Sequence, residues 1–315
     1  QIEYCYKVET RNEESEVFMK KIVLILATVL LVTCSVMFAF SACSSSETDD
    51  NSIIMYTHTP FAPYEWKGED GKMTGVDVAI MSQVAENLGK KLVIKDVAFD
   101  SIFSSVAKGG SFTAGAAGIT INETRKKQVD FSSVYSSSTL VIVSKSTISS
   151  LKGLENLSVA VQKDTSAHTI LEAATSEVGY SYTVEGSDGS QTQKNIKISS
   201  LTIRAFGDYN TCRINLQNGN VNAIVMDKLP AESLFFGDGS VNIYPASELP
   251  QEDFGIAVKK GNATLLDAIN EVVDIWLANG NMDKYLSYYS ALYEYEKGGG
   301  EQPTPPSGLK LEWNC

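Results

Sequence analysis

Between residues 53 and 280, short apolar runs alternate with segments of helical periodicity, and this alternation limits the possible folds most strongly. The apolar runs predict strands, and the segments between them predict helices, several of which end at a glycine. Strands that alternate with helices are typical of α/β proteins with largely parallel sheets. Ligands of such proteins bind beyond the carboxyl ends of the strands, where helix N-termini point.

We expect strands over residues 52–59, 91–99, 112–120, 138–145, 157–163, 222–228 and 254–260. We expect helices over residues 76–89, 100–110, 165–175 and 262–280, and a further helix that begins after Asn122. Residues 177–202 are polar and rich in glycine and serine, which favours a hairpin or another surface excursion. Residues 296–315 contain glycines and prolines without an apolar period, so we expect a flexible tail.

The composition argues against several classes of function. The net charge is −12 and no long basic run occurs, so we expect no nucleic-acid partner. The chain has 2 histidines and 5 cysteines, and their spacing matches no zinc site, so we expect neither a metal nor a cofactor. The cysteines are also too dispersed for a disulfide framework. A length of 315 residues allows one or two domains.

The N-terminal part of the chain indicates export. Two lysines follow Met19, and an uncharged, mostly apolar run then extends to Ala42, which is the pattern of a secretory signal peptide. Small residues precede Cys43, and serines and aspartates follow it, as in a bacterial lipoprotein signal. Cys34 is an alternative lipidation site. The same apolar run is long enough to span a bilayer as an uncleaved helix.

We therefore expect residues 19–42 to be a lipoprotein signal peptide and residues 43–52 to be a lipid-anchored tether. Residues 1–18 precede a natural start, and we expect them to be a non-native extension. The rest of the chain would lie outside the cytoplasm, anchored by lipid to the bacterial cell membrane.

Arg125 occupies an unusual position for a cation. Asn122 is a good N-cap residue, which places Arg125 in the first helical turn, where the helix dipole favours anions. Its guanidinium matches a carboxylate bidentately. The Thr120 hydroxyl and Gly118, which allows close approach to the backbone, would complete a carboxylate site. The alternative is a solvated arginine on an exposed turn.

Other polar side chains also follow predicted strands. Asp227 ends a buried-looking strand, where it can hold an ammonium group or cap the next helix. Thr165 and Ser166 open a helix, where they can bind an anion or serve only as caps. Phe61 follows the first predicted strand and Phe99 ends the second, and each is suited to stacking on a ligand or to the core.

Five segments occur in an order that resembles the extracellular solute-binding proteins of family 3, the substrate-binding components of amino-acid ABC importers. These segments read THTPFAPYEWKGEDGKMTGVDVAIMSQVAENLG, AGITINETRKKQVDFSSVY, SLKGLENLSVAVQKDTSA, NGNVNAIVMD and FGIAVKKGN. The resemblance covers Ile53 to Tyr293. It implies a type II periplasmic-binding-protein fold, in which two α/β lobes are joined by a two-crossing hinge. One lobe would comprise residues 53–138 plus 251–295, and the other residues 139–250.

The resemblance also implies roles for individual residues. Arg125 would bind the α-carboxylate of an amino acid, and Asp227 would hold its α-ammonium from the opposite lobe. The other residues implied to line the site are Thr120, Gly118, Phe61, Phe99, Thr165, Ser166, Ala117, Gln162 and His58.

One of these positions, His58, and one further residue, Asp164, bear on the identity of the ligand. His58 stands where some relatives place a carboxylate that reads basic ligands, which weakly disfavours lysine or arginine, although it can also be a bystander. Asp164 replaces a glycine and adds a negative charge near the expected carboxylate site. Either its side chain points to solvent or the ligand is not a simple α-amino acid.

The function implied is capture of a free amino acid between two lobes and its delivery to the permease of an ABC importer, by a monomer. One alternative is an extracellular domain that senses a ligand. Another is an enzyme of the same fold that resembles cyclohexadienyl dehydratases. Such an enzyme needs a general acid in the cleft, for which Glu65 or Asp164 can be nominated. No catalytic constellation is evident, so we expect no enzyme.

Overall fold

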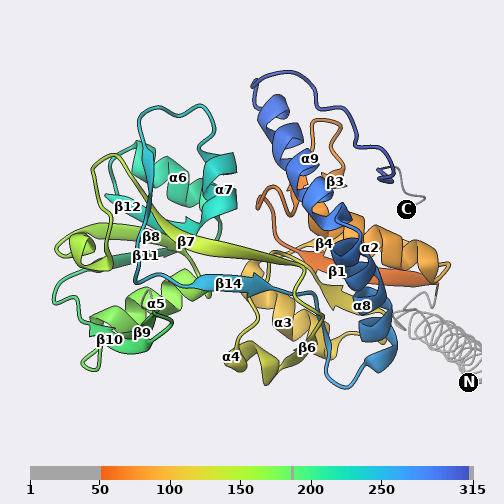
Figure 1. Ribbon diagram of the computed structural model, residues 1–315, viewed down its shortest axis with the longest axis horizontal. Coiled ribbons are helices and arrows are strands. Elements are labelled where there is room, and N and C mark those ends of the chain that lie inside the picture. The colour runs from red at the N-terminus through yellow and green to blue at the C-terminus, as the bar shows by residue number, and fades with distance from the viewer. Residues whose placement is uncertain (1–50, 186–187, 312–315) are drawn as a thin grey trace, which may run out of the picture. The chain divides into compact units, whose positions relative to one another are not determined.

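The computed structural model describes residues 51–185 and 188–311, which belong to one compact unit (Figure 1). The predicted signal peptide and both candidate lipidation sites, Cys34 and Cys43, lie outside the described residues. Within the described ranges, the helices are too short or too polar to cross a membrane.

The first lobe is built on a sheet with the strand order β4-β1-β5-β15-β6. Strand β1 is parallel to β4 and β5, and β15 is antiparallel to β5 and β6. Helices α2 and α3 cover opposite faces, because neighbouring residues of β15 point to different cores: Val258 packs in the core with α2, and Ala257 in the core with α3. The strands are Ser52–Thr57 (β1), Lys91–Asp96 (β4), Thr113–Gly115 (β5), Val129–Phe131 (β6) and Ala257–Lys259 (β15). The helices are Val76–Asn87 (α2), Phe99–Lys108 (α3), Glu123–Lys126 (α4), Ala263–Ala278 (α8) and Asn281–Glu296 (α9).

The second lobe is built on a sheet with the order β11-β8-β12-β7-β13. Strand β8 is parallel to β11 and β12, and β7 is antiparallel to β12 and β13. Helices α5 and α6 again pack in different cores, on opposite faces of β8. The strands are Ser136–Ser144 (β7), Ser158–Gln162 (β8), Thr202–Phe206 (β11), Ala223–Asp227 (β12) and Asn242–Pro245 (β13). The helices are Leu151–Leu154 (η1, a 3₁₀ helix), Ser166–Thr175 (α5), Tyr209–Gln217 (α6) and Lys228–Leu234 (α7).

The chain crosses between the two sheets on paired strands. Strand β14 (Gln251–Phe254) runs antiparallel to the first half of β7, and Figure 1 shows the two side by side between the lobes. The prediction of two α/β lobes joined by two crossings is therefore confirmed. The lobe limits proposed from the sequence, near residues 138 and 251, fall on these two strands.

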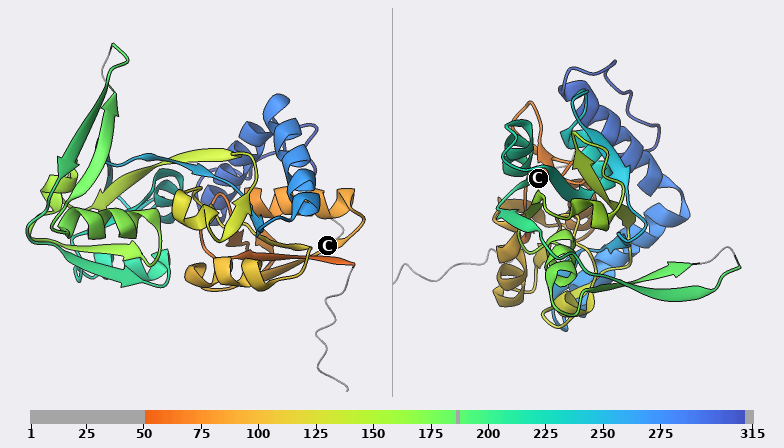
Figure 2. Two further views of the ribbon diagram at one scale, coloured as in Figure 1. Left: turned by 90° about the horizontal axis from the view of Figure 1, so that it is seen from below. Right: turned by 90° about the vertical axis from the view of Figure 1, so that its left-hand side faces the viewer.

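The predicted surface excursion is a hairpin. Strands β9 (Tyr180–Glu185) and β10 (Gln191–Ile196) pair antiparallel in a sheet of their own, which projects from the second lobe in Figure 2. A smaller hairpin in the first lobe joins β2 (Trp66–Lys67) and β3 (Met73–Thr74).

Some predicted boundaries are wrong. The strand expected to reach Phe99 ends at Asp96, and Phe99 is instead the first residue of α3. The strand expected over residues 112–120 keeps only Thr113–Gly115, because the chain then leaves the sheet. Gly118, with φ of 52°, makes this departure possible, and its amide donates to the Asp77 carboxylate. The apolar run expected over residues 254–260 is divided between β14 and β15.

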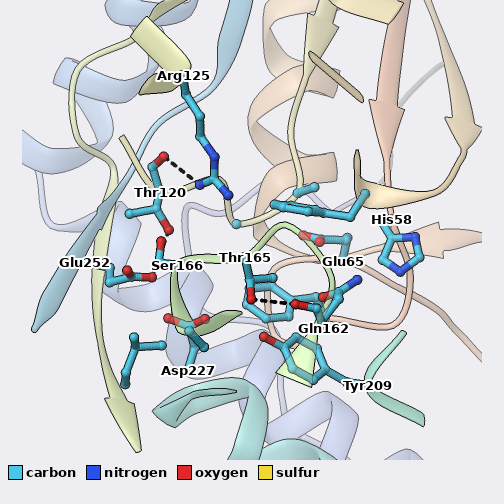
Figure 3. A pocket seen from close by; sticks show the side chains of 16 residues that line it. His58, Glu65, Thr120, Arg125, Gln162, Thr165, Ser166, Tyr209, Asp227 and Glu252 are labelled. Atoms are coloured by element: carbon cyan, nitrogen blue, oxygen red, sulfur yellow. Dashed lines mark hydrogen bonds between the residues drawn. The ribbon is translucent and has the colours of Figure 1, made fainter. Parts of the chain in front are cut away.

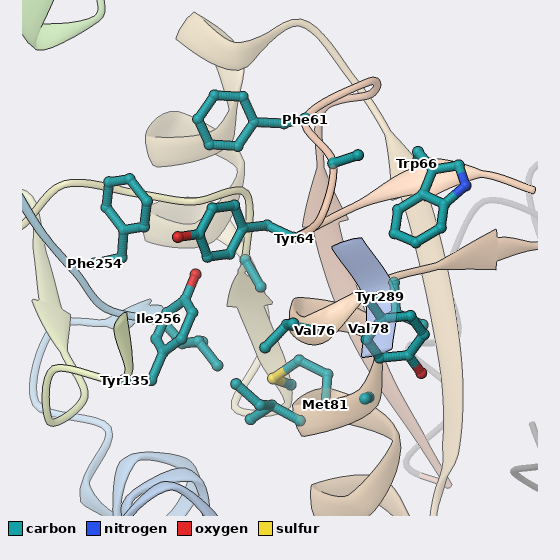
Figure 4. Close-up of a cluster of buried hydrophobic side chains, with 14 of the residues drawn as sticks. Phe61, Tyr64, Trp66, Val76, Val78, Met81, Tyr135, Phe254, Ile256 and Tyr289 are labelled. Atoms are coloured by element: carbon teal, nitrogen blue, oxygen red, sulfur yellow. The ribbon is translucent and has the colours of Figure 1, made fainter. Parts of the chain in front are cut away.

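Helix α9 and the segment after it pack on the first lobe. The ring of Trp66 from β2 makes edge contacts with the ring of Tyr289 (Figure 4) and with that of Tyr293. Its Nε1 donates to Glu296 Oε2 at 2.7 Å. Between α9 and residue 311, where the described part ends, the structure has no helix or strand, yet Leu309 and Leu311 pack against the same core. The described part of the tail that we expected to be flexible therefore contacts the lobe.

We predict that Trp66→Ala destabilises the protein by about 3–5 kcal/mol, because it removes a large side chain that is 2% exposed. Chemical denaturation measures this free energy. Tyr295→Ala, on the exposed side of α9, is the matched control and is expected to cost less than about 1 kcal/mol. Equal losses in the two variants would contradict the packing of α9 on β2.

Candidate ligand-binding cavity

A cavity lies between the lobes, at the carboxyl ends of parallel strands of both sheets (Figure 3). The space between its walls, including the part open to solvent, is about 370 Å³, and the part of it that the centre of a water-sized sphere can occupy is about 20 Å³, so the lobes lie close together here. Every residue proposed from the sequence for ligand binding lines it. These residues are His58, Phe61, Phe99, Ala117, Gly118, Thr120, Arg125, Gln162, Thr165, Ser166 and Asp227. The lining residues that the sequence analysis did not assign to ligand binding are Glu65, Leu140, Ala167, Tyr209 and Glu252.

Arg125 is held in the cavity wall by local and long-range contacts. The Asn122 side chain accepts from the Arg125 amide at 2.8 Å, which confirms the predicted N-cap. The guanidinium donates through Nη1 to the Thr120 carbonyl at 2.8 Å and through Nη2 to the Asp164 carbonyl at 3.1 Å. Since Arg125 is 6% exposed, the alternative of a solvated arginine is wrong.

Arg125 also has aromatic and anionic neighbours. Its guanidinium carbon lies 5.3 Å from the ring centre of Phe99 and 5.1 Å from that of Phe103. Burial lowers the pKa of the guanidinium, and the charges of Glu252 and Asp227 oppose that shift. Because the ordinary pKa of arginine is so high, the group stays a cation.

Asp227 faces the cavity from the second lobe. It ends β12 and precedes α7, but its side chain makes no capping hydrogen bond. It is 6% exposed, and Oδ1 finds no hydrogen-bond partner within residues 51–185 and 188–311. Burial raises the pKa of this carboxyl, and the charge of Glu252 raises it further. The carboxylate is thus available to a ligand rather than used as a helix cap.

Glu252 is a wall residue that sequence reasoning missed. It lies on β14, is 6% exposed, and accepts from the Thr120 hydroxyl at 2.9 Å. Burial raises its pKa, and hydrogen bonding and the charge of Arg125 act in the opposite direction. The surrounding sequence, LPQEDF, contains no strand-end or helix-start signal, so only the path of the crossing strand reveals this position.

Thr165 and Ser166, at the start of α5, both line the cavity, and Thr165 also caps the helix. The Thr165 hydroxyl donates to the Gln162 carbonyl at 2.8 Å and accepts from the His168 amide at 3.4 Å, so it does act as a cap. Ser166, the first residue of the helix, lines the cavity. The Gln162 side chain is held by the Gly207 carbonyl at 3.1 Å.

The Asp164 carboxylate, which the sequence placed near the proposed carboxylate site, is on the outside. Its side chain is 52% exposed, and Oδ2 lies 3.9 Å from Lys163 Nζ. Its φ of 61° is in the left-handed region, which suits the glycine that it replaces. Its carbonyl oxygen accepts from Arg125, and the charge of its carboxylate raises the pKa of that guanidinium, as do the charges of Glu252 and Asp227.

Aromatic rings close the cavity. Phe61 from the first lobe stacks on Tyr209 from the second, with ring centres 5.9 Å apart and an interplanar angle of 20°. Gly118 permits this position of Phe61, since a Cβ there would lie 2.2 Å from the ring. His58 donates through Nδ1 to the Val97 carbonyl at 2.7 Å, and its Nε2 is buried without a partner in the described part of the chain.

Two buried carboxyl groups lie next to each other at this wall, Glu65 among the lining residues and Asp77 behind them. Asp77 accepts from the Gly118 amide at 3.0 Å, and a side-chain hydrogen bond joins it to Glu65. Burial raises the pKa of Asp77 from 3.8 to about 6. Burial, and then the charge of Asp77, raise the pKa of Glu65 well above its usual range.

The raised pKa of Asp77 predicts a pH-dependent stability. Because the folded state binds the proton more tightly than the unfolded state, stability falls as pH rises from about 4 through 6, by about 3 kcal/mol. We expect Asp77→Asn to remove that part of the decline, measured by denaturation between pH 4 and 7. Asp70→Asn, at an exposed carboxylate, is the control. An unchanged slope in Asp77→Asn would contradict the assignment.

Known proteins resemble the chain over most of its length. The arginine-binding extracellular protein ArtP of Bacillus subtilis (strain 168) is 28% identical over 263 residues, which cover 81% of this chain and 94% of ArtP. The L-cystine-binding protein TcyJ of Escherichia coli (strain K12) is 24% identical over 254 residues, or 79% and 86% of the two chains. A solved structure of the substrate binding protein of an amino acid ABC transporter is 30% identical, with a TM-score of 0.63, and covers 76% of this chain and 98% of that one.

The family model of the bacterial extracellular solute-binding proteins, family 3, matches residues 53–291. That range contains every lining residue of the cavity and, apart from Ser52 of β1, both lobe sheets. The chain therefore belongs to the bacterial extracellular solute-binding proteins of family 3.

Proposed function

We propose that this protein captures a free amino acid in the cavity between its lobes and delivers it to the permease of an ABC importer. The observation that carries this proposal is that Arg125 and Asp227, which come from different lobes, line one cavity and are each 6% exposed. A guanidinium binds a carboxylate bidentately, and a carboxylate binds an ammonium. Together they match the two charges that every free α-amino acid carries.

A ligand held in this way would couple binding to closure of the lobes. Its α-carboxylate would contact Arg125 in the first lobe, and its α-ammonium would contact Asp227 in the second. A zwitterion can make both contacts only when the lobes are together, so it binds the closed state more tightly. A closed, loaded form differs in surface from an open one, which lets a permease distinguish the two.

Binding, rather than catalysis, is the role that we assign to the cavity. Of the two acids nominated for a dehydratase-like reaction, Asp164 is not among the lining residues, and Glu65 is. The named relatives bind arginine and cystine, and neither name describes a reaction. We therefore expect the bound amino acid to be recovered unchanged, from a monomeric protein.

We also propose that the protein acts outside the cytoplasm and is anchored by lipid at Cys43, with Cys34 as the second candidate. The family is extracellular, and the residues before Cys43 have the pattern of a lipoprotein signal. We expect the protein to take up labelled palmitate in a bacterial host and Cys43→Ala to abolish the label. If Cys43→Ala keeps the label and Cys34→Ala loses it, the lipid anchor would be assigned to Cys34 instead of Cys43.

We predict that Arg125→Ala and Asp227→Asn each weaken amino-acid binding by about 2–5 kcal/mol, because each leaves a buried charge of the ligand without its partner. Calorimetric titration against the twenty amino acids and cystine measures this, after the protein has been unfolded and refolded to remove carried ligand. Lys126→Ala, at the exposed neighbour of Arg125, is the control and is expected to bind as the parent does. Tight binding retained in both site variants would refute the proposal.

A further inference from the structure

The two lobes also meet away from the cavity, through apolar side chains. Helix α7 of the second lobe packs on α9 of the first, and Figure 1 shows both helices on the same side of the molecule. A small pocket between the lobes on this side is lined mostly by apolar residues, which include Pro60, Ala62 and Tyr293 of the first lobe and Met226, Pro230 and Leu234 of the second. Closure of the lobes therefore buries apolar surface in addition to the cavity wall.

This interface includes a contact between Phe236 and Gly299. Phe236 follows α7 in the second lobe, and Gly299 follows α9 in the first. The ring of Phe236 lies so close to the Gly299 main chain that a Cβ on Gly299 would overlap with it. The Phe236 side chain is 38% exposed, so this contact covers part of a ring that otherwise lies at the surface of its lobe.

Gly299 is held in place by the first lobe. Its amide donates to the Glu294 carbonyl at 2.9 Å, within the turn that ends α9. Further along the chain, the Tyr285 hydroxyl donates to the Lys310 carbonyl at 3.0 Å, and Leu309 packs against the core. The segment after α9, residues 297–311, is thus attached to the first lobe at both ends. Gly299 would move with that lobe, whereas Phe236 would move with the other.

Neither Phe236 nor Gly299 is among the described residues that line the cavity. A contact outside the cavity cannot distinguish one ligand from another. Because it joins the two lobes, however, it stabilises the closed state whatever the ligand is. The apparent affinity of a protein rises with the population of its binding-competent state, so this contact would strengthen the binding of every ligand by the same factor.

We propose that Phe236 and Gly299 form an interlobe latch that favours closure and thereby sets the affinity for all ligands without contacting any of them. The proposal rests on the function proposed above, because it requires a ligand that binds between the lobes. It assigns to the segment after α9, which the sequence indicated as a flexible tail, a part in ligand capture. The latch differs in its effect from Asp227, whose proposed contribution depends on the ammonium group of the ligand.

The competing interpretation is that the contact of Phe236 with Gly299 only stabilises the fold. A purely structural contact would lower the free energy of unfolding when it is removed and leave the affinity of the folded protein unchanged. The latch predicts weaker binding by a protein that is still folded. Ligand affinity and the size of the ligand-free protein therefore decide between the two interpretations.

Phe236→Ala and Gly299→Ala break the contact from opposite lobes. By calorimetry on the refolded protein, we expect each variant to bind every ligand of the parent more weakly by one common factor of roughly tenfold. The double variant should lose little more than either single one, because both remove the same contact.

Two variants serve as matched controls and are expected to bind as the parent does. Gly239→Ala adds a Cβ that would meet no atom of the described chain within 4 Å. Ile275→Ala removes an apolar side chain of α8 that is 52% exposed.

Small-angle X-ray scattering tests closure directly. We expect the ligand-free variants to have a larger radius of gyration than the ligand-free parent, and all the proteins to agree at saturating ligand. Unchanged affinity in both variants, a loss that depends on the ligand, or ligand-free variants no larger than the parent would overturn the latch. A parent that binds no amino acid would refute the proposed function, and the scattering of the ligand-free proteins would still decide whether the latch exists.

Discussion

The cavity depends on one buried cation, the guanidinium of Arg125, which donates to carbonyl groups of both lobes. The helix that carries it, α4, has four residues and would not form in isolation. The Asn122 cap and the hydrogen bonds from Arg125 to Thr120 and Asp164 therefore stabilise this short helix. The helix in turn positions the Arg125 side chain. A cation in this position needs an anion or aromatic rings around it, and the wall provides both.

The same contacts explain how the lobes can be together and yet separable. Besides the hydrogen bond from Arg125 to Asp164, the lobes meet through the ion pair of Lys163 with Asp100, the stack of Phe61 on Tyr209 and the packing of α7 on α9, and these contacts do not involve the crossing strands. The paired strands β7 and β14 remain as the covalent connection. Because one hydrophobic core contains residues of both lobes, opening would expose apolar surface, and a ligand that adds contacts to both lobes shifts the balance toward closure.

Sequence reasoning reached those parts of the site that local chemistry determines. Asn122 and Arg125 are three residues apart, so a cap and a first-turn arginine follow from the letters alone, and a strand-end aspartate such as Asp227 is visible in the same way. Phe99 was placed at the end of a strand, because the apolar run KLVIKDVAF does not reveal that α3 begins at its last residue. The structure nevertheless brings Phe99 to the cavity, since strand ends and helix starts meet at the same edge of the sheet.

What sequence reasoning missed depends on the path of the chain over long distances. Glu252 lies in the cavity because β14 returns along β7, and Tyr209 because α6 begins at the end of β11. Glu65 appears in the sequence as one acid in a polar turn, and only the packing of Phe61 and Asp77 around it makes it a buried wall residue. Capping also could not be decided locally, since Thr165 caps its helix and Asp227 does not.

The buried carboxyl groups connect the stability of this protein with the binding proposed for its cavity. Buried acids with raised pKa values cost the folded state free energy when they ionise, and a more apolar wall would avoid that cost. The ammonium group of an amino acid bound as proposed would lie beside Asp227 and pair its charge, so part of this cost would be recovered on binding. A ligand without that group would leave the Asp227 carboxyl unpaired, and the penalty on such a ligand would add to selectivity, as is general for polar sites shielded from water.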